Sequence, residues 1–207
     1  MIQQSFEQIV ASLAAKTPTP GGGAAAALAG SMGAALFLMV VRYSRGKKAN
    51  VAREGDLQVA ETKLEGQVKA LLPMAEADCK SFDAVSAALA MPKETDTHKA
   101  ARHAALQRAT QGAMVVPEQT LDLVRTVCAT VQPVVGCISK TIASDLAAGA
   151  ALMLAAAEGA FLNVKINAQG LDDKVFAAAA TQRTTAVLQQ VRDFHKATVA
   201  TVDALLA

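Results

Sequence analysis

The feature that most constrains the fold is an uncharged segment of glycine, alanine and other apolar residues near the N-terminus. Residues 18–41 read PTPGGGAAAALAGSMGAALFLMVV, a proline-flanked run of three glycines followed at once by small side chains. A helix that is apolar on every side must be buried, so residues 22–44 predict a core helix. Ala26, Gly30 and Ala34 recur at every fourth residue, which predicts a smooth face against which another backbone packs closely.

The three glycines at the start of this helix are candidate ligand-binding residues. Gly21, Gly22 and Gly23 lack Cβ atoms, so their backbone can approach a ligand and present N–H groups at the positive end of the helix. Such a turn suits an anionic or electron-rich ligand. The alternative is a plain tight loop before a packing helix.

The same segment is about long enough to cross a bilayer. Much of it is alanine and glycine, which gain little from hydrocarbon, and we expect no second comparable charge-free segment. The segment therefore predicts a buried helix of a soluble protein, with no membrane partner.

The composition of the whole chain favours helices packed on helices. The 207 residues are 52% hydrophobic but only 3% aromatic, and there is no tryptophan, so close backbone approach must replace large rings in the core. We expect a single domain over residues 1–207. A net charge of +2 and few stacking aromatics argue against a nucleic-acid partner.

The cysteines and the N-terminus indicate a reducing compartment. Cys79, Cys128 and Cys137 are odd in number and show no C-x-x-C spacing, and the N-terminus lacks the basic and apolar regions of a signal peptide. We therefore expect a cytoplasmic protein.

Hydrophobic periodicity predicts helices along the rest of the chain. The expected helices are a short one from Phe6 that ends before Pro18, residues 22–44, an amphipathic stretch 51–90 divided at Pro73, residues 96–131 interrupted at Pro117 and capped by Thr95, residues 146–164 capped by Ser144-Asp145, and a last helix to Leu206 after a turn at 167–172. The fold class is all-α: an up-and-down bundle of about five or six long helices. Because two helices are nearly uncharged, we expect a dimer or a higher oligomer.

Ordered motifs along the chain resemble a known enzyme family. These motifs are the P-T-P-G-G-G segment, Gly46-Lys47-Lys48, Asp78 with Phe82-Asp83 and Pro92-Lys93, and Ser144-Asp145 before a helix ending Asn163-Val164-Lys165-Ile166-Asn167. Their order from Phe6 to Phe176 is similar to the formiminotransferase-cyclodeaminase / methenyltetrahydrofolate cyclohydrolase family. The resemblance implies a cyclodeaminase-like helical homodimer. It also implies hydrolysis of 5,10-methenyltetrahydrofolate to 10-formyltetrahydrofolate, or release of ammonia from formiminotetrahydrofolate, with folate as substrate and no cofactor.

Water attack on the cationic methenyl bridge needs a positioned base. Asp145, at the mouth of an apolar helix, is the first candidate for this catalytic role, with Ser144 to orient the carboxylate or the water. The alternatives are a helix cap for Asp145 and a local turn for Ser144. Lys47 and Lys48 form a cationic cluster with Arg45. Lys48 is the candidate for proton transfer, and Lys47 is the candidate for binding the anionic glutamate tail of the folate. The alternative is that these cations stabilise the dipole of the preceding helix.

Further candidates for binding the substrate lie on two later helices. Asp78 and Phe82 share a helix face. The carboxylate could accept hydrogen bonds from a pterin while the Phe82 ring packs against it. The alternative for Phe82 is an ordinary place in the hydrophobic core. Asn163 and Asn167 lie one turn apart, and we expect their amides to form hydrogen bonds with a ligand or with the neighbouring backbone. The histidines and cysteines have no zinc-ligand spacing, so no metal site is expected.

The chain departs from the family pattern in two places. Ile138-Ser139-Lys140-Thr141 stands where the family commonly reads like G-N-P-N, and Ala49-Asn50 follows Lys48 where a tyrosine is often seen. The leading hypothesis is a methenyltetrahydrofolate cyclohydrolase, favoured because no formiminotransferase region accompanies it here. The alternatives are a formiminotetrahydrofolate cyclodeaminase and a non-catalytic helical interaction module.

Overall fold

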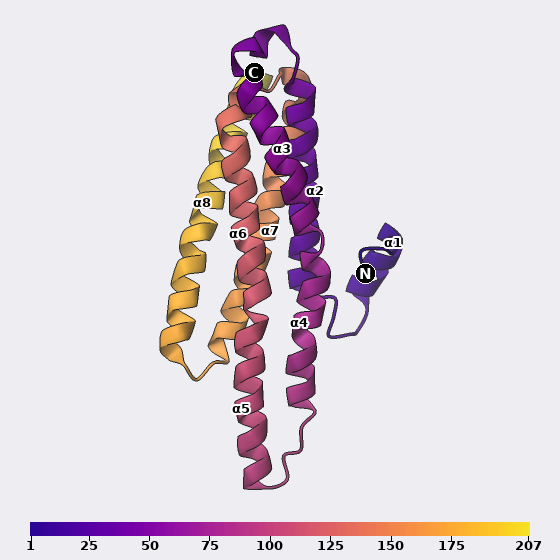
Figure 1. The fold of residues 1–207 in the computed structure, drawn as a ribbon, viewed down its shortest axis with the longest axis vertical. Helices are drawn as coiled ribbons and strands as arrows, with labels where there is room; N and C mark the ends of the chain where they lie inside the picture. The colour runs from indigo at the N-terminus through magenta and orange to yellow at the C-terminus, as the bar shows by residue number, and fades with distance from the viewer.

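The computed structural model describes residues 1–207 as an elongated bundle of helices without strands (Figure 1). The α-helices are α1 (Phe6–Ala14), α2 (Gly22–Ser44), α3 (Glu54–Leu71), α4 (Met74–Leu89), α5 (Asp96–Ala113), α6 (Val115–Val131), α7 (Ala143–Gln169) and α8 (Lys174–Leu206). Short 3-10 helices connect them at η1 (Lys48–Arg53), η2 (Gln132–Cys137) and η3 (Lys140–Ile142). The expected all-α class is confirmed.

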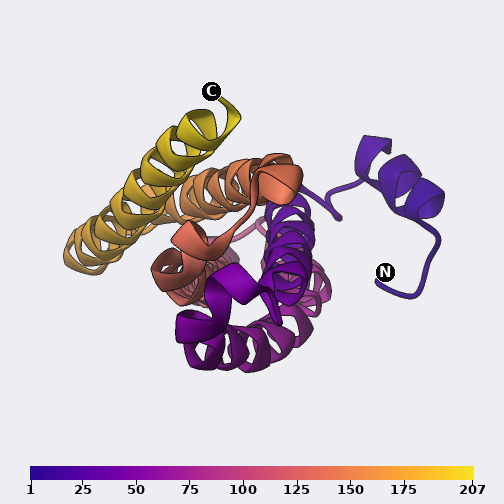
Figure 2. The same ribbon diagram turned by 90° about the horizontal axis from the view of Figure 1, so that it is seen from above.

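The chain runs up and down along the long axis. α3 continues into α4 and α5 into α6, so that the bundle consists of α2, α3/α4, α5/α6, α7 and α8 (Figure 1). Seen from above, α7 lies between α2 and α8, and the short α1 stands apart from the other helices (Figure 2). The expected topology of five or six long helices is therefore confirmed.

The chain breaks its helices near both prolines as expected, but the second break lies before the proline itself. α3 ends at Leu71 and α4 begins at Met74, around Pro73 as expected. The second break lies at Met114, before Pro117. A proline ring clashes with the carbonyl four residues earlier, here that of Ala113, so the helix is interrupted upstream of the proline itself.

The helix ends confirm one predicted cap and correct another. Thr95 caps α5, since its hydroxyl accepts a hydrogen bond from the His98 amide. The prediction that Ser144-Asp145 caps α7 is wrong: α7 begins at Ala143, and its N-cap Ile142 makes no side-chain capping bond. Because η3 runs directly into α7, Ser144 and Asp145 already lie in the first turn. α7 also continues to Gln169, so the turn predicted at 167–172 starts later.

α2 and α7 pack antiparallel along their length through small residues. A Cβ placed on Gly33 would lie 3.0 Å from the Gly149 carbonyl oxygen, and one on Gly159 would lie 2.9 Å from the Ala26 Cβ. The Phe37 ring covers Gly149 and meets Phe194 of α8 edge-on, with ring centroids 5.8 Å apart. The smooth face predicted around Ala26 is confirmed as a packing face.

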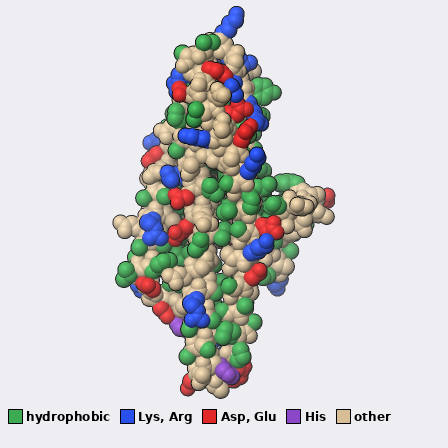
Figure 3. Space-filling model, viewed as in Figure 1, with side chains coloured by type: hydrophobic (Ala, Val, Ile, Leu, Met, Phe, Trp, Pro, Cys, Tyr) green, Lys and Arg blue, Asp and Glu red, His purple; other side chains and the backbone are tan.

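Ion pairs hold the end of α2 against α3. Arg42 pairs with Glu61 and Glu65, and Arg45 pairs with Glu54 and Glu61. Acidic and basic side chains are interspersed with apolar ones over the face shown in Figure 3. Such pairs orient the helices but stabilise an exposed surface only modestly.

Two segments, α2 and Lys140–Gln169, are each long and apolar enough to span a membrane. The expectation that no second such segment follows is therefore wrong. Core helices of soluble proteins pass the same test, and here α2 is packed against α3, α4, α6 and α7.

Substitution Gly149→Ala should destabilise the bundle. The new Cβ would lie 2.7 Å from the Phe37 ring, and overpacking of this kind typically costs about 1–3 kcal/mol. The control is Gly66→Ala in α3, where a Cβ meets nothing within 4 Å and helix propensity predicts a gain of about 0.5–1 kcal/mol. Urea unfolding at one protein concentration measures both; equal midpoints for the two variants would contradict this packing account.

Candidate active site

The glycine run and Asp78 form one site at the start of α2. Gly21 is the N-cap of α2 and makes no side-chain capping bond. Instead the Asp78 carboxylate of the neighbouring α4 lies against this helix end, where the Ala24 amide stabilises its charged form. A Cβ on Gly23 would lie 2.2 Å from Asp78 Oδ1 and 2.5 Å from its Cγ. Only glycine at position 23 therefore lets the carboxylate reach the helix end.

Burial sets the acid–base character of this carboxylate. Desolvation raises the pKa of Asp78 above its usual value, and the Ala24 amide partly offsets the rise by stabilising the charged form. No Lys, Arg or His lies within 4.0 Å of Asp78 to neutralise it. Burial, with the nearby Asp78 charge, also raises the pKa of the adjacent Cys79 thiol, which disfavours a thiolate nucleophile there.

Asn163 of α7 borders the same helix end. Its amide nitrogen donates to the Gly159 carbonyl over 2.8 Å and lies 3.5 Å from a Cβ placed on Gly22. Its amide oxygen makes no hydrogen bond within the chain and can accept one from a ligand. Asn167, also half-buried, is one turn farther along α7.

Phe82 lies one turn after Asp78 on α4 and is half-buried. It belongs to none of the hydrophobic core clusters, which disfavours the alternative that it is ordinary core. We call the set around the start of α2 the glycine end: Gly21, Gly22, Gly23, Asp78, Phe82, Asn163 and Asn167.

The remaining predicted residues lie at the other end of α2 and α7. Asp145 and Asn163 are both on α7, about five turns and about 27 Å apart. Lys47 and Lys48 follow α2, are exposed and make no ion pair. We call Lys47, Lys48, Ser144 and Asp145 the lysine end. The structure does not bring these residues to the glycine run within one chain.

The predicted cationic cluster is smaller than expected. Arg45 is held by Glu54 and Glu61, and the Gly46 amide donates to Glu54 over 2.9 Å. Gly46 has φ +68, a left-handed conformation that glycine adopts easily. The two lysines are therefore the cations at this end that remain free for a ligand.

The two departures from the family pattern have structural roles here. The buried Asn50 amide donates to the carbonyls of Ser44 and Cys137, which ties η1 to η2. Ile138 is buried, and Lys140 donates to the Leu206 carbonyl near the end of α8. Both segments therefore close the lysine end of the bundle.

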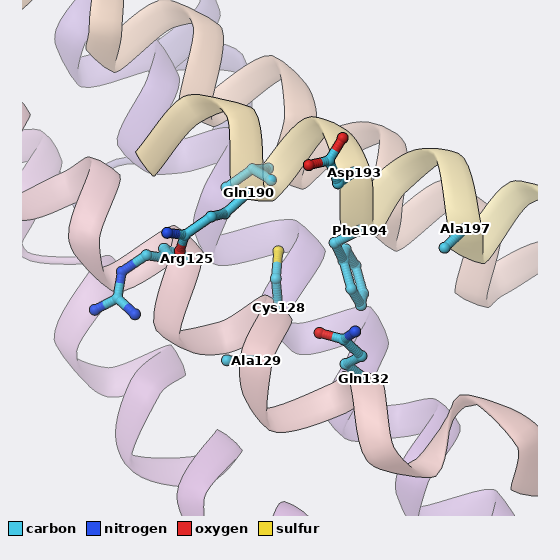
Figure 4. A pocket seen from close by; sticks show the side chains of 9 residues that line it. Arg125, Cys128, Ala129, Gln132, Gln190, Asp193, Phe194 and Ala197 are labelled. Atoms are coloured by element: carbon cyan, nitrogen blue, oxygen red, sulfur yellow. The ribbon is translucent and has the colours of Figure 1, made fainter. Parts of the chain in front are cut away.

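A separate groove of about 410 Å³ lies between α6 and α8 (Figure 4). Cys128 and Phe194 face its interior, while Arg125 points outward. Burial raises the pKa of Cys128 to about 12. The groove contains none of the predicted site residues. No three His, Cys, Asp or Glu side chains in the structure lie close enough together to hold a metal ion.

Comparison with known proteins places this chain in a family. The family model of formiminotransferase-cyclodeaminase matches residues 5–186. A methenyltetrahydrofolate cyclohydrolase of Methylorubrum extorquens is 40% identical over 174 residues, which are 84% of each chain. This chain belongs to the formiminotransferase-cyclodeaminase family.

More distant similarities extend over nearly the whole chain. The formimidoyltransferase-cyclodeaminase of Sus scrofa is 27% identical over 93% of this chain, which corresponds to 36% of that longer protein. The crystal structure of formiminotetrahydrofolate cyclodeaminase from Thermotoga maritima superposes with a TM-score of 0.87 at 23% identity, covering 99% of this chain and 98% of that one. The family membership and helical architecture expected from the sequence are thus confirmed.

Sequence reasoning missed the link between the glycine run and Asp78. It treated them as separate motifs, and it preferred Asp145 for the base. One signal was available: no Ser, Thr, Asp or Asn stands at the N-cap of α2, although such residues are strongly preferred there. A helix start without its own side-chain cap leaves its first amides open to a group from elsewhere in the fold.

The stability of Asp78→Asn relative to the wild type should depend on pH. Because the pKa of Asp78 is raised in the folded state, its proton stabilises the fold fully below its ordinary pKa of 3.8, and this contribution is lost as pH rises through the folded pKa. The asparagine variant should therefore gain stability relative to the wild type between pH 3.8 and neutrality.

Urea unfolding across this pH range provides the measurement. Asp83→Asn, an exposed carboxylate on the same helix, controls for the loss of one negative charge. A pH-independent difference between wild type and Asp78→Asn would contradict the effect of burial on Asp78.

Proposed function

We propose that this protein hydrolyses 5,10-methenyltetrahydrofolate to 10-formyltetrahydrofolate, with Asp78 as the general base. The observation that carries the proposal is the partly buried Asp78 carboxylate held against the amide end of α2. The 40% identical relative named a methenyltetrahydrofolate cyclohydrolase supports the same reaction. Asp145, the first candidate from the sequence, lies at the opposite end of α7 from this carboxylate.

The reaction uses the carboxylate first as a counter-charge and then as a base. The methenyl bridge is a cation, which an unpaired carboxylate attracts strongly in a partly dehydrated site. Water attacks the bridge carbon as Asp78 accepts one of its protons, which gives a neutral tetrahedral adduct. The carbon–N5 bond then breaks, its electron pair stays on N5, and the remaining hydroxyl proton is transferred to N5 as the formyl C=O forms. One proton is released overall.

The neighbouring groups suit the rest of the substrate. The amides of Gly22 and Gly23 lie in the first turn of α2, where helical N–H groups lack partners within the helix, and they can donate to oxygens of the substrate or the adduct. Phe82 offers a ring for the flat pterin, and Asn163 offers a free amide oxygen. The reaction proposed here needs no cofactor.

Release of ammonia from formiminotetrahydrofolate is the second candidate, because it proceeds at the same carbon. It is the activity in the name of the 27% identical Sus scrofa protein. The higher identity to the cyclohydrolase favours hydrolysis. We further propose a cytoplasmic homodimer that binds neither nucleic acid nor membranes.

The direct experiment mixes the purified protein with 5,10-methenyltetrahydrofolate and follows the loss of methenyl absorbance. Ammonia release from formiminotetrahydrofolate is measured in parallel. We expect fast loss of absorbance and little ammonia. The reverse result would favour the cyclodeaminase, and rates equal to buffer in both assays, with no thermal shift on adding reduced folates, would favour a non-catalytic helical module.

Substitution Gly23→Ala should lower kcat/KM while leaving the protein folded. The new Cβ displaces the Asp78 carboxylate, and positioned acid–base groups contribute about 10²–10⁴-fold to rates. Gly55→Ala, at an open position of α3, is the matched control and should keep wild-type kcat/KM. Full activity in Gly23→Ala would argue against Asp78 as the base.

A further inference from the structure

A groove between the end of α7 and the start of α8 is lined by two lysines and by no acidic residue. Its volume is about 630 Å³, and it lies beside the turn that joins the two helices, at the lower left of Figure 1. Lys165 and Gln169 line it from α7, and Lys174 lines it from the first position of α8. We call this hollow the two-lysine groove. The rest of its lining is small or polar: Ala168, Ala177, Ala178, Thr181 and Gln182.

The positive charge of the two-lysine groove is uncompensated within the chain. Neither Lys165 nor Lys174 forms an ion pair with a carboxylate. The two acidic residues of the adjoining turn are engaged elsewhere. Asp172 lies 2.6 Å from the His103 ring, and Asp173 caps α8. Two like charges that line one hollow attract an anion, because their potentials add there.

The position of Lys174 is not explained by the stability of its own helix. The start of a helix is its positive end, where a cation is disfavoured. Lys174 nevertheless occupies the first position of α8. Its ammonium group is held at the groove by a hydrogen bond to the Leu171 carbonyl, over 2.6 Å. A negatively charged ligand in the groove would offset this unfavourable placement.

The last turns of α7 place three kinds of side chain next to one another around the helix. Each residue of an α-helix turns by about 100°, so Asn163 and Lys165, two positions apart, lie on opposite sides of α7. Asn163 lies beside the start of α2, and Lys165 lines the groove against α8. Leu162 and Ile166, which are 56% and 63% exposed, lie on the side between them. From α2 to α8 the surface therefore changes from amide to apolar to cationic.

A folate has the same order of chemical groups along its length. Its pterin forms hydrogen bonds, its aminobenzoyl ring is flat and apolar, and the glutamate at the far end is anionic. An α-helix with its side chains is about 10–12 Å wide, which an extended folate can cross. A pterin at the glycine end would thus place the aminobenzoyl ring on Leu162 and Ile166 and the carboxylates at the two-lysine groove.

We propose that the two-lysine groove binds the glutamate tail of the folate substrate, and that Lys165 and Lys174 set a preference for longer γ-glutamate tails. This inference rests on the proposed function and names the part of the molecule that recognises the tail. It replaces Lys47, the candidate from the sequence, in that role. Lys47 follows the far end of α2, about 33 Å along the helix from Gly22.

The kinetic test compares substrates that differ only in the tail. Methenyltetrahydrofolate with one glutamate and with three γ-linked glutamates is assayed by the loss of methenyl absorbance. We expect the wild-type KM to be lower for the triglutamate. In the Lys165→Met/Lys174→Met variant the KM for the triglutamate should rise about tenfold, because each exposed ion pair changes an affinity by up to about fivefold. Its kcat should stay unchanged, since neither lysine contacts the reacting carbon.

Two control variants separate the effect of charge from that of packing. Lys165→Arg/Lys174→Arg keeps both charges and should keep the low KM for the triglutamate. Lys196→Met removes one exposed charge of α8 outside the groove and should leave the tail preference unchanged. Added salt should reduce the preference in the wild type and not in the double methionine variant, because salt screens exposed charges.

A binding measurement tests the groove without catalysis. Tri-γ-glutamate, which has no pterin, is titrated into the wild type and into the Lys165→Met/Lys174→Met variant, and the backbone amides are followed by NMR. The amide resonances of Lys165, Gln169 and Lys174 should shift in the wild type and not in the variant. Inorganic phosphate is the comparison. An equal response to phosphate would indicate a general anion site and would contradict the assignment to the tail.

Three kinetic results would overturn the proposal: equal wild-type KM values for one and three glutamates, a tail preference retained by Lys165→Met/Lys174→Met, or loss of the preference in Lys47→Met alone. Failure of the proposed function is recognised differently, as absence of both folate activities in the wild-type protein. In that case the titration with tri-γ-glutamate alone decides whether the groove binds the tail.

Discussion

The close contact between α2 and α7 is the constraint on which the rest of the bundle depends, and it places Asn163 of α7 beside the glycine run of α2. Gly33 against Gly149 and Ala26 against Gly159 allow the two backbones to approach, and even a methyl group at one of these glycines would crowd its neighbours. This contact fixes the register that puts Asn163 beside Gly22.

The start of α2 shows how a structural requirement and a chemical one are met by the same group. Amides in the first turn of a helix attract negative charge, and the Asp78 carboxylate of α4 lies against the first turn of α2. The helix end, and not a lysine or arginine, lies against the carboxylate. The negative charge of Asp78 therefore remains available to a ligand. Gly23 makes this possible because it has no side chain to exclude the carboxylate.

The sequence was sufficient to predict most of the fold, because helical periodicity and the charge-free segments depend on local pattern. It located the α2 boundaries and the Pro73 break. It failed at α7, where η3 replaces a side-chain cap, and at Met114, where the clash of a proline acts upstream. Motifs identified the site residues by type but not by position, since their grouping depends on how α2, α4 and α7 are packed together.

The position of the Asp78 carboxylate beside the Ala24 amide has a consequence for repeated turnover. A base that has taken a proton must release it before the next cycle. Burial favours the protonated, neutral form of Asp78, while the Ala24 amide at the positive end of α2 favours the charged form. Burial is the larger influence, so the pKa of Asp78 stays raised, but the Ala24 amide limits the rise. The helix end beside the base thereby also favours its return to the charged, reactive form.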